Sequence, residues 1–265
     1  MHKMKDERLT SKRVTVNGQT IHYKASIDAG TSNKPVLILI HGLVVSCRYL
    51  LPTARELSND YAVYVPDFPG YGWSSKPPHG QALNMAELAD ALAAWMDEIG
   101  IQRASLLGNS MGCQIIAQFA LRYPQRLERA ILVAPTMDRK ARTAHQEIGR
   151  WLLNAPFEPK SLFPVVTLDY LQIGFRRFVR TFRFALQDHI EEHLPHISVP
   201  TLVVRGSRDT VVPQRWAEEV TALLPRGKLV VIEKAAHDVN YNSPRQLAEA
   251  VRQFMQEEET AAVLP

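Results

Sequence analysis

Ser110, Asp209 and His237 are the residues of this chain whose types and order could carry out nucleophilic catalysis. Ser110 is the centre of G-N-S-M-G, residues 108–112, which lies between an apolar run and a segment of helical composition. A serine at the tip of a sharp strand-to-helix turn has strained backbone angles, and the residues two positions away on either side must lack side chains. The two glycines of the motif meet that requirement. The sequence therefore predicts an exposed, nucleophilic hydroxyl at Ser110.

Asp209 and His237 each follow a stretch that we expect to be a buried strand, residues 199–205 and 227–232. Parallel strands end at one edge of a sheet, so the carboxylate and the imidazole can converge there with Ser110. His237 would then take the proton of the Ser110 hydroxyl, while Asp209 would fix the imidazole tautomer and stabilise its cationic form. This chemistry is acyl transfer through a covalent intermediate.

Backbone N–H groups that could stabilise a negatively charged oxygen are predicted at two places. The N–H of Met111 follows the nucleophile at a helix N-terminus, where the partial charge is positive. The second donor is the N–H of Leu43 or Val44, in the loop H-G-L-V-V-S that follows the apolar run 35–40. We interpret the neighbouring His41 as a residue that ties this loop together by hydrogen bonds.

Two other polar residues are interpreted as structural. Asp67 lies in a stretch rich in turn-forming residues and precedes Ser110 in the chain, so we interpret it as a carboxylate that organises its own loop. His22 lies in a predicted strand, and we expect it either to point outward or to be satisfied within the sheet. No metal site is predicted.

The elements that must position these residues alternate along the chain. Short apolar runs indicate strands, and longer stretches with apolar residues at helical spacing indicate helices. Asn17-Gly18 is a strong signal for a hairpin between the first two strands. The pattern predicts an α/β fold with a mostly parallel central sheet of about eight strands and helices on both faces. The expected strands include residues 12–16, 20–25, 35–40, 61–65, 104–107, 130–134, 199–205 and 227–232.

The alternation stops between residues 135 and 195, where no buried strand is expected. This segment contains several helical pieces, many aromatic residues and four prolines by residue 164. We therefore predict a helical cap at 135–195, inserted into a core made of residues 1–134 and 196–265. Arginine and phenylalanine mix at helical spacing within the cap, which is typical of an amphipathic helix with phenylalanine inward.

The same cap segment could instead line a substrate pocket, with an apolar wall for an acyl or aromatic group and an arginine for a carboxylate. The candidate pocket residues are Arg176, Phe178 and Arg180, together with Asn109 of the nucleophile motif.

The composition describes a globular protein with a mildly basic balance. A net charge of +4 over 265 residues suits small anionic molecules or loose surface contacts, but it is not a nucleic-acid signature. The opening residues 1–8 are not followed by the apolar segment of a signal peptide, and no stretch reaches the roughly 18 apolar residues of a membrane span. Two cysteines do not make a disulfide framework. We expect a cytoplasmic monomer or homodimer with a small-molecule substrate and without stable membrane anchoring.

Five motifs make the chain similar to the α/β-hydrolase family over about residues 14–257. They are H-G-L (41–43), D-F-P-G-Y-G-W-S-S-K-P (67–77), G-N-S-M-G (108–112), G-S-R-D-T-V-V-P (206–213) and A-A-H (235–237). The resemblance implies a Ser-Asp-His triad, a cap after the sixth strand and no cofactor. Ser110 excludes the branches of the family that use an aspartate nucleophile. Some relatives carry their catalytic acid after the sixth strand, where this chain has Asp138.

The resemblance to the serine branch implies hydrolysis of a small or medium acyl ester, or of a lactone. G-N-S-M-G is also similar to the hydrolases that cleave C–C bonds in ring-fission products of aromatic degradation, although the tryptophan usual after their catalytic histidine is Asp238 here. A third hypothesis is a catalytically silent ligand-binding protein on the same fold, since a fold does not fix a function.

Overall fold

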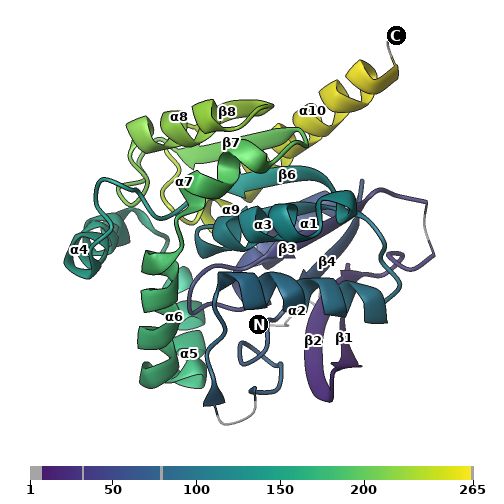
Figure 1. The fold of residues 1–265 in the computed structure, drawn as a ribbon, viewed down its shortest axis with the longest axis horizontal. Coiled ribbons are helices and arrows are strands. Elements are labelled where there is room, and N and C mark those ends of the chain that lie inside the picture. Colours follow the sequence, from purple (N-terminus) through teal and green to yellow (C-terminus); the bar gives the residue numbers. More distant parts are fainter. Residues whose placement is uncertain (1–7, 32, 78–79, 264–265) are drawn as a thin grey trace.

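A computed structural model of the chain describes residues 8–31, 33–77 and 80–263. Its centre is one eight-stranded sheet in the order β1-β2-β4-β3-β5-β6-β7-β8 (Figure 1). Strand β2 pairs in antiparallel fashion with β1 and β4, and the pairs formed among β3 to β8 are parallel. The predicted α/β fold with a mostly parallel sheet is therefore confirmed. The expectation about a signal peptide falls on residues 1–7, outside the described residues.

The strands are short and most are apolar. Their bounds are β1 Leu9–Val16, β2 Gln19–Ser26, β3 Val36–Ile40, β4 Ala62–Pro66, β5 Ala104–Asn109, β6 Leu127–Val133, β7 Thr201–Gly206 and β8 Gly227–Ile232. The turn between β1 and β2 is the predicted two-residue hairpin, since Asn17 and Gly18 both have positive φ angles, 48° and 76°.

Helices follow most of the parallel strands. Their bounds are α1 Leu51–Leu57, α2 Met85–Glu98, α3 Met111–Arg122, α8 Gln214–Leu223, α9 Val239–Asn242 and α10 Pro244–Val263. Helix α2 begins with a capping box, in which the Asn84 side chain accepts from the N–H of Glu87 and the Glu87 side chain accepts from the N–H of Asn84. None of the helices in the described part of the chain is both long and apolar enough to span a bilayer.

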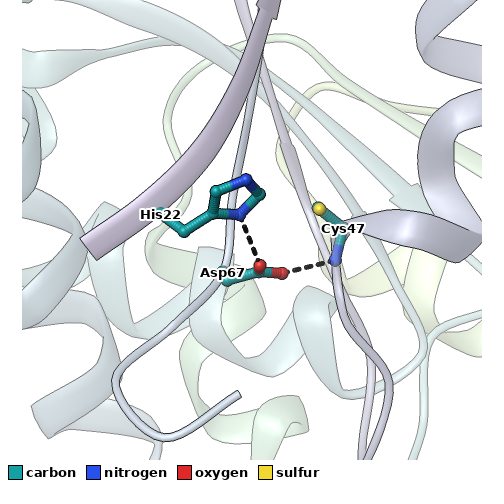
Figure 2. Close-up of side chains that lie close together, drawn as sticks. All are labelled: His22, Cys47 and Asp67. Carbon is teal, nitrogen blue, oxygen red and sulfur yellow. Dashed lines mark hydrogen bonds and ion pairs between the residues drawn. The ribbon is translucent and has the colours of Figure 1, made fainter. Parts of the chain in front are cut away.

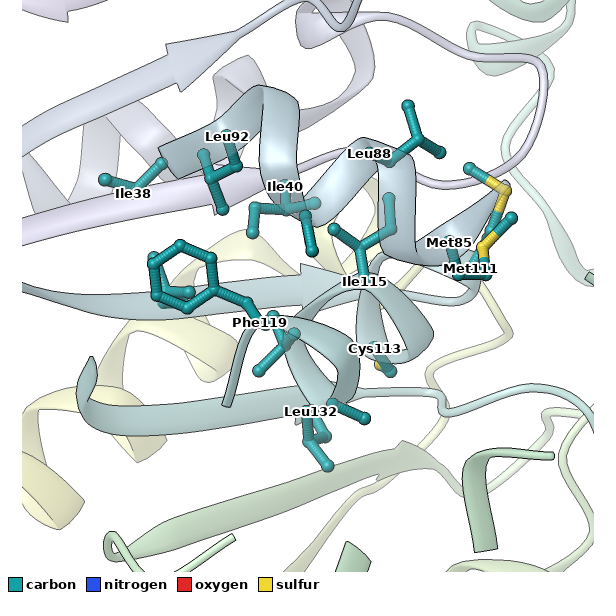
Figure 3. Packing of buried hydrophobic residues seen from close by; sticks show 14 of the residues in the cluster. Ile38, Ile40, Met85, Leu88, Leu92, Met111, Cys113, Ile115, Phe119 and Leu132 are labelled. Atoms are coloured by element: carbon teal, nitrogen blue, oxygen red, sulfur yellow. The ribbon is translucent and has the colours of Figure 1, made fainter. Parts of the chain in front are cut away.

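The core lies in two layers, one on each face of the sheet. Ile38 and Ile40 of β3 point to one face, where Figure 3 shows them among residues of α2 and α3 such as Leu88 and Phe119. Leu37 and Leu39 alternate to the other face and belong to the cluster that includes α1 and α10. Each fully buried residue of this size stabilises the fold by about 1.5–3 kcal/mol. The double burial explains why β3 is continuously apolar in sequence.

Between β6 and β7 the chain forms helices instead of strands. These are α4 Ala144–Asn154, α5 Leu162–Ile173, α6 Phe175–Gln187 and α7 Ile190–His193, with short 3-10 turns at Ala155–Phe157 and Leu194–His196. Figure 1 shows α5 and α6 side by side at one end of the molecule. The aromatic rings of Tyr170 and Phe178 join these two helices, with centroids 5.2 Å apart.

Candidate active site

Ser110 stands between β5 and α3 in a backbone conformation that few residues adopt. Its φ and ψ angles are 56° and −120°. The two glycines of the motif have no room for a side chain. A Cβ at Gly108 would lie 2.6 Å from the carbonyl of Gly112, and one at Gly112 would lie 2.6 Å from the oxygen of Ile40. The spacing of the motif thus follows from the crowding at this turn, and the strain is stored at the residue proposed as the nucleophile.

His237 and Asp209 are hydrogen-bonded to each other. The distance from His237 Nδ1 to Asp209 Oδ2 is 3.0 Å. The other carboxylate oxygen, Oδ1, accepts hydrogen bonds from the N–H groups of Val211 and Val212 at 2.8 and 2.9 Å. With Nδ1 as the donor, Nε2 is left as the acceptor of the neutral ring. This atom is buried and has no hydrogen-bond partner among the described residues.

The loop that carries Asp209 is itself held by an arginine that sequence reasoning missed. Arg205, at the end of β7, donates to the carbonyl oxygens of Val212 and Asp209 at 2.7 and 2.9 Å. A single arginine at the end of a strand belongs to no recognisable sequence pattern. The sequence therefore does not indicate that Arg205 holds the Asp209 loop.

The carboxylate also sets the charge of the imidazole. Burial is the largest single effect and favours the neutral ring, but the charge and hydrogen bond of Asp209 and the other nearby carboxylates together raise the pKa of His237 to about 9. Asp238 and Glu158 add smaller contributions in the same direction. His237 is thus mostly protonated at neutral pH, and the fraction that can act as a base increases with pH.

We therefore expect the rate of any reaction that uses His237 as a base to increase with pH. Below the pKa of His237, kcat/KM should fall about tenfold for each pH unit. Initial rates of ester hydrolysis between pH 6 and 10, corrected for the spontaneous reaction, measure this profile. Asp238→Asn removes a nearby negative charge and should move the profile to lower pH. A profile that is flat from pH 6 to 9 would contradict a base with this pKa.

The predicted oxyanion donors are placed by α3 and by the loop after β3. Met111 is the first residue of α3, so its N–H has no intrahelical acceptor. Leu43 lines the same cavity as Ser110, whereas Val44 is not among the residues that line it. Of the two alternatives for the second donor, the structure therefore favours Leu43.

Tyr49 is the second residue that sequence reasoning missed. Its hydroxyl accepts from the N–H of Gly42 at 2.7 Å and donates to Asn109 Oδ1 at 2.9 Å. The Asn109 amide in turn lies 3.4 Å from the carbonyl oxygen of His237. These contacts connect the oxyanion loop, the nucleophile strand and the histidine loop. Tyr49 lies in a stretch that looks like an ordinary amphipathic helix, so its sequence context gave no signal.

Ser110 and His237 share a cavity of about 190 Å³. Its walls are mostly apolar, and its lining residues are Gly42, Leu43, Val45, Tyr49, Asn109, Ser110, Trp151, Asn154, Ala155, Glu158, Leu162, Phe163, Val166, Tyr170, His237 and Asp238. Asn109, predicted as a pocket residue, is among them. Leu162, Val166 and Tyr170 are spaced four residues apart on α5, so they form one stripe along the face that lines the cavity.

Arg176, Phe178 and Arg180 do not line this cavity, which corrects the alternative that placed them there. Phe178 packs between aromatic rings of the helical segment, with centroids 5.2 Å from Tyr170 and 5.9 Å from Phe182. Arg176 and Arg180 are exposed. The cause is that α4 and α5, and not α6, supply the helical part of the cavity wall.

Two carboxylates lie at the cavity, and none of the described lining residues is a lysine or arginine. Glu158 Oε1 accepts from the N–H of Asp238 and from the side chain of Asn154, both at 2.9 Å, and Oε2 accepts from the side chain of Asn242 at 3.0 Å. Burial and the nearby Glu158 raise the pKa of Asp238 to about 7. The polar part of this cavity is therefore acidic.

Asp67 is held in its own hydrogen-bond network away from this cavity (Figure 2). One carboxylate oxygen accepts from the N–H of Cys47 at 2.7 Å, and the other lies 2.7 Å from His22 Nδ1 and 3.0 Å from the N–H of Trp73. The far nitrogen of His22 lies 2.5 Å from the hydroxyl of Ser11. His22, Cys47 and Asp67 are close enough to share an ion, but these bonds already occupy the carboxylate and the imidazole. This geometry fits the loop-organising role that we inferred for Asp67.

His41 and Asp138 also have structural partners. The two ring nitrogens of His41 contact the oxygen of Gly42 at 3.0 Å and the N–H of Phe68 at 3.2 Å, which ties two loops together. Asp138 accepts from Arg150 at 2.8 Å and from Arg215 at 3.0 Å. His237 is hydrogen-bonded to Asp209 and not to Asp138.

Comparison with known proteins identifies the family to which this chain belongs. Residues 37–250 match the alpha/beta hydrolase family. The chain is 24% identical to the carboxylesterase YbfK of Bacillus subtilis, covering 86% of this chain and 83% of that protein. It is 25% identical to the uncharacterized hydrolase YugF of the same organism, covering 92% and 97%.

A solved structure described as a membrane phospholipase A superposes with a TM-score of 0.79 at 27% identity, covering 95% of this chain and 87% of that one. Because the family match spans more than half of the chain, and because the sheet order and the turn at Ser110 agree with it, the chain belongs to the alpha/beta hydrolase family.

Proposed function

We propose that this protein is a serine hydrolase that cleaves neutral carboxylic esters or lactones through an acyl-enzyme. The observation that carries the proposal is that a strained Ser110 lines the same cavity as His237, whose buried Nε2 has no hydrogen-bond partner among the described residues. The carboxylesterase and phospholipase names among the similar proteins agree with ester hydrolysis.

The reaction follows from the atoms at this site. The Ser110 oxygen attacks the ester carbonyl while its proton moves to His237 Nε2, and Asp209 stabilises the resulting imidazolium. The N–H groups of Met111 and Leu43 stabilise the oxyanion, by roughly 3 kcal/mol for each donor. The C–O bond then breaks, and the alcohol leaves with the proton from His237. In the second half, water attacks the acyl-serine and gives its proton to His237, which returns it to Ser110.

The charge of the cavity argues for a neutral substrate. Glu158 and Asp238 lie beside His237, and none of the described lining residues is a lysine or arginine. A substrate that carries a carboxylate would meet like charge in a partly desolvated space, where such repulsion is strong. Ring-fission products of aromatic compounds carry a carboxylate, so the C–C hydrolase alternative is disfavoured.

A catalytically silent binding protein is disfavoured for a different reason. The strain at Ser110 and the unpartnered Nε2 of His237 have a cost in stability, and a binding protein gains nothing from either. The segment 135–195 supplies the wall opposite Ser110 through α4 and α5, and we propose that it acts as the cap that selects the acyl group.

Hydrolysis of p-nitrophenyl esters from acetate to laurate tests the function and measures the preferred acyl length. A matched pair, p-nitrophenyl valerate and mono-p-nitrophenyl glutarate, tests the charge of the substrate at nearly constant size. We expect kcat/KM for the glutarate to be lower by at least about tenfold, and the difference to shrink in Asp238→Asn. A higher kcat/KM for the glutarate would contradict the proposal of a neutral substrate. If none of the esters were hydrolysed in a Ser110-dependent reaction, the proposal of an esterase would be wrong.

A further inference from the structure

Helix α5 presents an apolar face to the outside of the molecule. Phe163, Leu168 and Leu171 are 53%, 51% and 76% exposed. The one acidic or basic residue of the helix, Asp169, is buried and paired with Arg48. A helix that is apolar all round is normally covered on every side. Within the described chain, nothing covers this face.

The apolar surface continues onto the neighbouring elements. Phe175, at the start of α6, is 78% exposed, and Leu152 and Leu153 of α4 are 70% and 65% exposed. The rings of Trp151 and Phe182 join α4 to α6, and those of Tyr170 and Phe178 join α5 to α6. We call these outward side chains of α4, α5 and the start of α6 the apolar patch. A patch of this kind on a protein surface marks a docking site.

The charges around the apolar patch have one sign. Between residues 144 and 187, the exposed aspartate, glutamate, lysine and arginine side chains are all cations, namely Lys160, Arg176, Arg180 and Arg183. The three arginines are spaced four and three residues apart on α6, so they form one stripe. The acidic residues of the same segment are buried or half-buried.

We propose that the apolar patch docks reversibly on a bilayer that contains anionic lipids. Exposed leucine and phenylalanine side chains can insert into the interfacial region of a membrane. Arginine and lysine beside them are attracted to anionic lipid headgroups. A second copy of the chain fits less well, because a two-fold contact would place the same patch on both sides and would offer the arginines no exposed carboxylate from residues 144–187. Phe163 belongs both to the patch and to the cavity lining, so the cavity borders the patch.

Cosedimentation of the full chain with vesicles tests the docking without using hydrolysis. The probes are vesicles of phosphatidylcholine alone and of phosphatidylcholine with phosphatidylglycerol. We expect binding to the anionic vesicles, weakened by salt, and a loss of at least about tenfold in Leu168→Glu/Leu171→Glu and in Arg176→Glu/Arg180→Glu. Matched controls at exposed sites elsewhere are Ile27→Glu and Lys12→Glu/Arg13→Glu, which should change binding by less than about threefold.

Three outcomes would overturn the proposal. One is that the wild type does not sediment with anionic vesicles. Another is that the control variants lose as much binding as the patch variants, which would show a non-specific effect of charge. The third is that light scattering finds a dimer that Leu168→Glu/Leu171→Glu converts to a monomer, which would assign the patch to a second copy. Melting temperatures of all variants show that they are folded, whether or not the protein hydrolyses esters.

Discussion

Ser110→Ala is expected to lower kcat for p-nitrophenyl ester hydrolysis by at least about four orders of magnitude, because it removes the atom that forms the acyl-enzyme. The folded structure should be unaffected or slightly more stable, since alanine leaves no hydroxyl at a strained turn. Initial rates with wild type and variant side by side, together with melting temperatures, measure both effects.

Ser105→Ala is the matched control for this variant. Ser105 is buried in β5, the strand that leads to Ser110, and its hydroxyl has no hydrogen-bond partner among the described residues. Its removal should leave the rate within about twofold and should not lower stability, because no hydrogen bond is lost. Full activity in Ser110→Ala would show that another group is the nucleophile.

The second large effect is expected from Asp209→Asn, with a loss of roughly three to four orders of magnitude in kcat. An amide at this position accepts less strongly from His237 Nδ1 and does not stabilise the imidazolium. The variant also lowers the pKa of His237, because the carboxylate that raises it is gone. Initial rates as a function of pH separate the loss of rate from the change in pKa.

Asp138→Asn is the control that decides where the catalytic acid lies. The Asp138 carboxylate is bound by Arg150 and Arg215, so its loss should lower the melting temperature while kcat changes by only a few-fold. If Asp138→Asn lowered kcat more than Asp209→Asn, the catalytic acid would be Asp138, after β6, and the role given to Asp209 would be wrong.

Much of this arrangement could be predicted from the sequence because strong local constraints produce it. A Cβ at Gly108 or Gly112 would lie less than 3 Å from neighbouring backbone atoms, so both positions require glycine. This requirement produces a spacing of glycines that can be recognised in the sequence. Strands buried on both faces read as continuous apolar runs, as β3 does. Since parallel strands end at one edge, residues that follow them could be brought together without knowledge of any distance.

The helical segment between β6 and β7 could not be predicted to the same depth. Periodicity identified α6 as an amphipathic helix, but it does not say which helix faces Ser110. Apolar residues also occupy the outward face of helix α5, so its inward stripe of Leu162, Val166 and Tyr170 did not stand out in the sequence. The roles of Tyr49 and Arg205 depend on hydrogen bonds to residues in other loops, which leave no pattern in the chain.

The most direct test of the account is the site at which a fluorophosphonate reacts with the protein. We expect one covalent adduct by intact mass, located on Ser110 by peptide mapping, and no adduct in Ser110→Ala. We also expect slower labelling in His237→Ala, because the base that activates the hydroxyl is gone. An unlabelled wild type, or a label on another hydroxyl such as that of Ser11 beside His22, would contradict the assignment of Ser110 as the nucleophile.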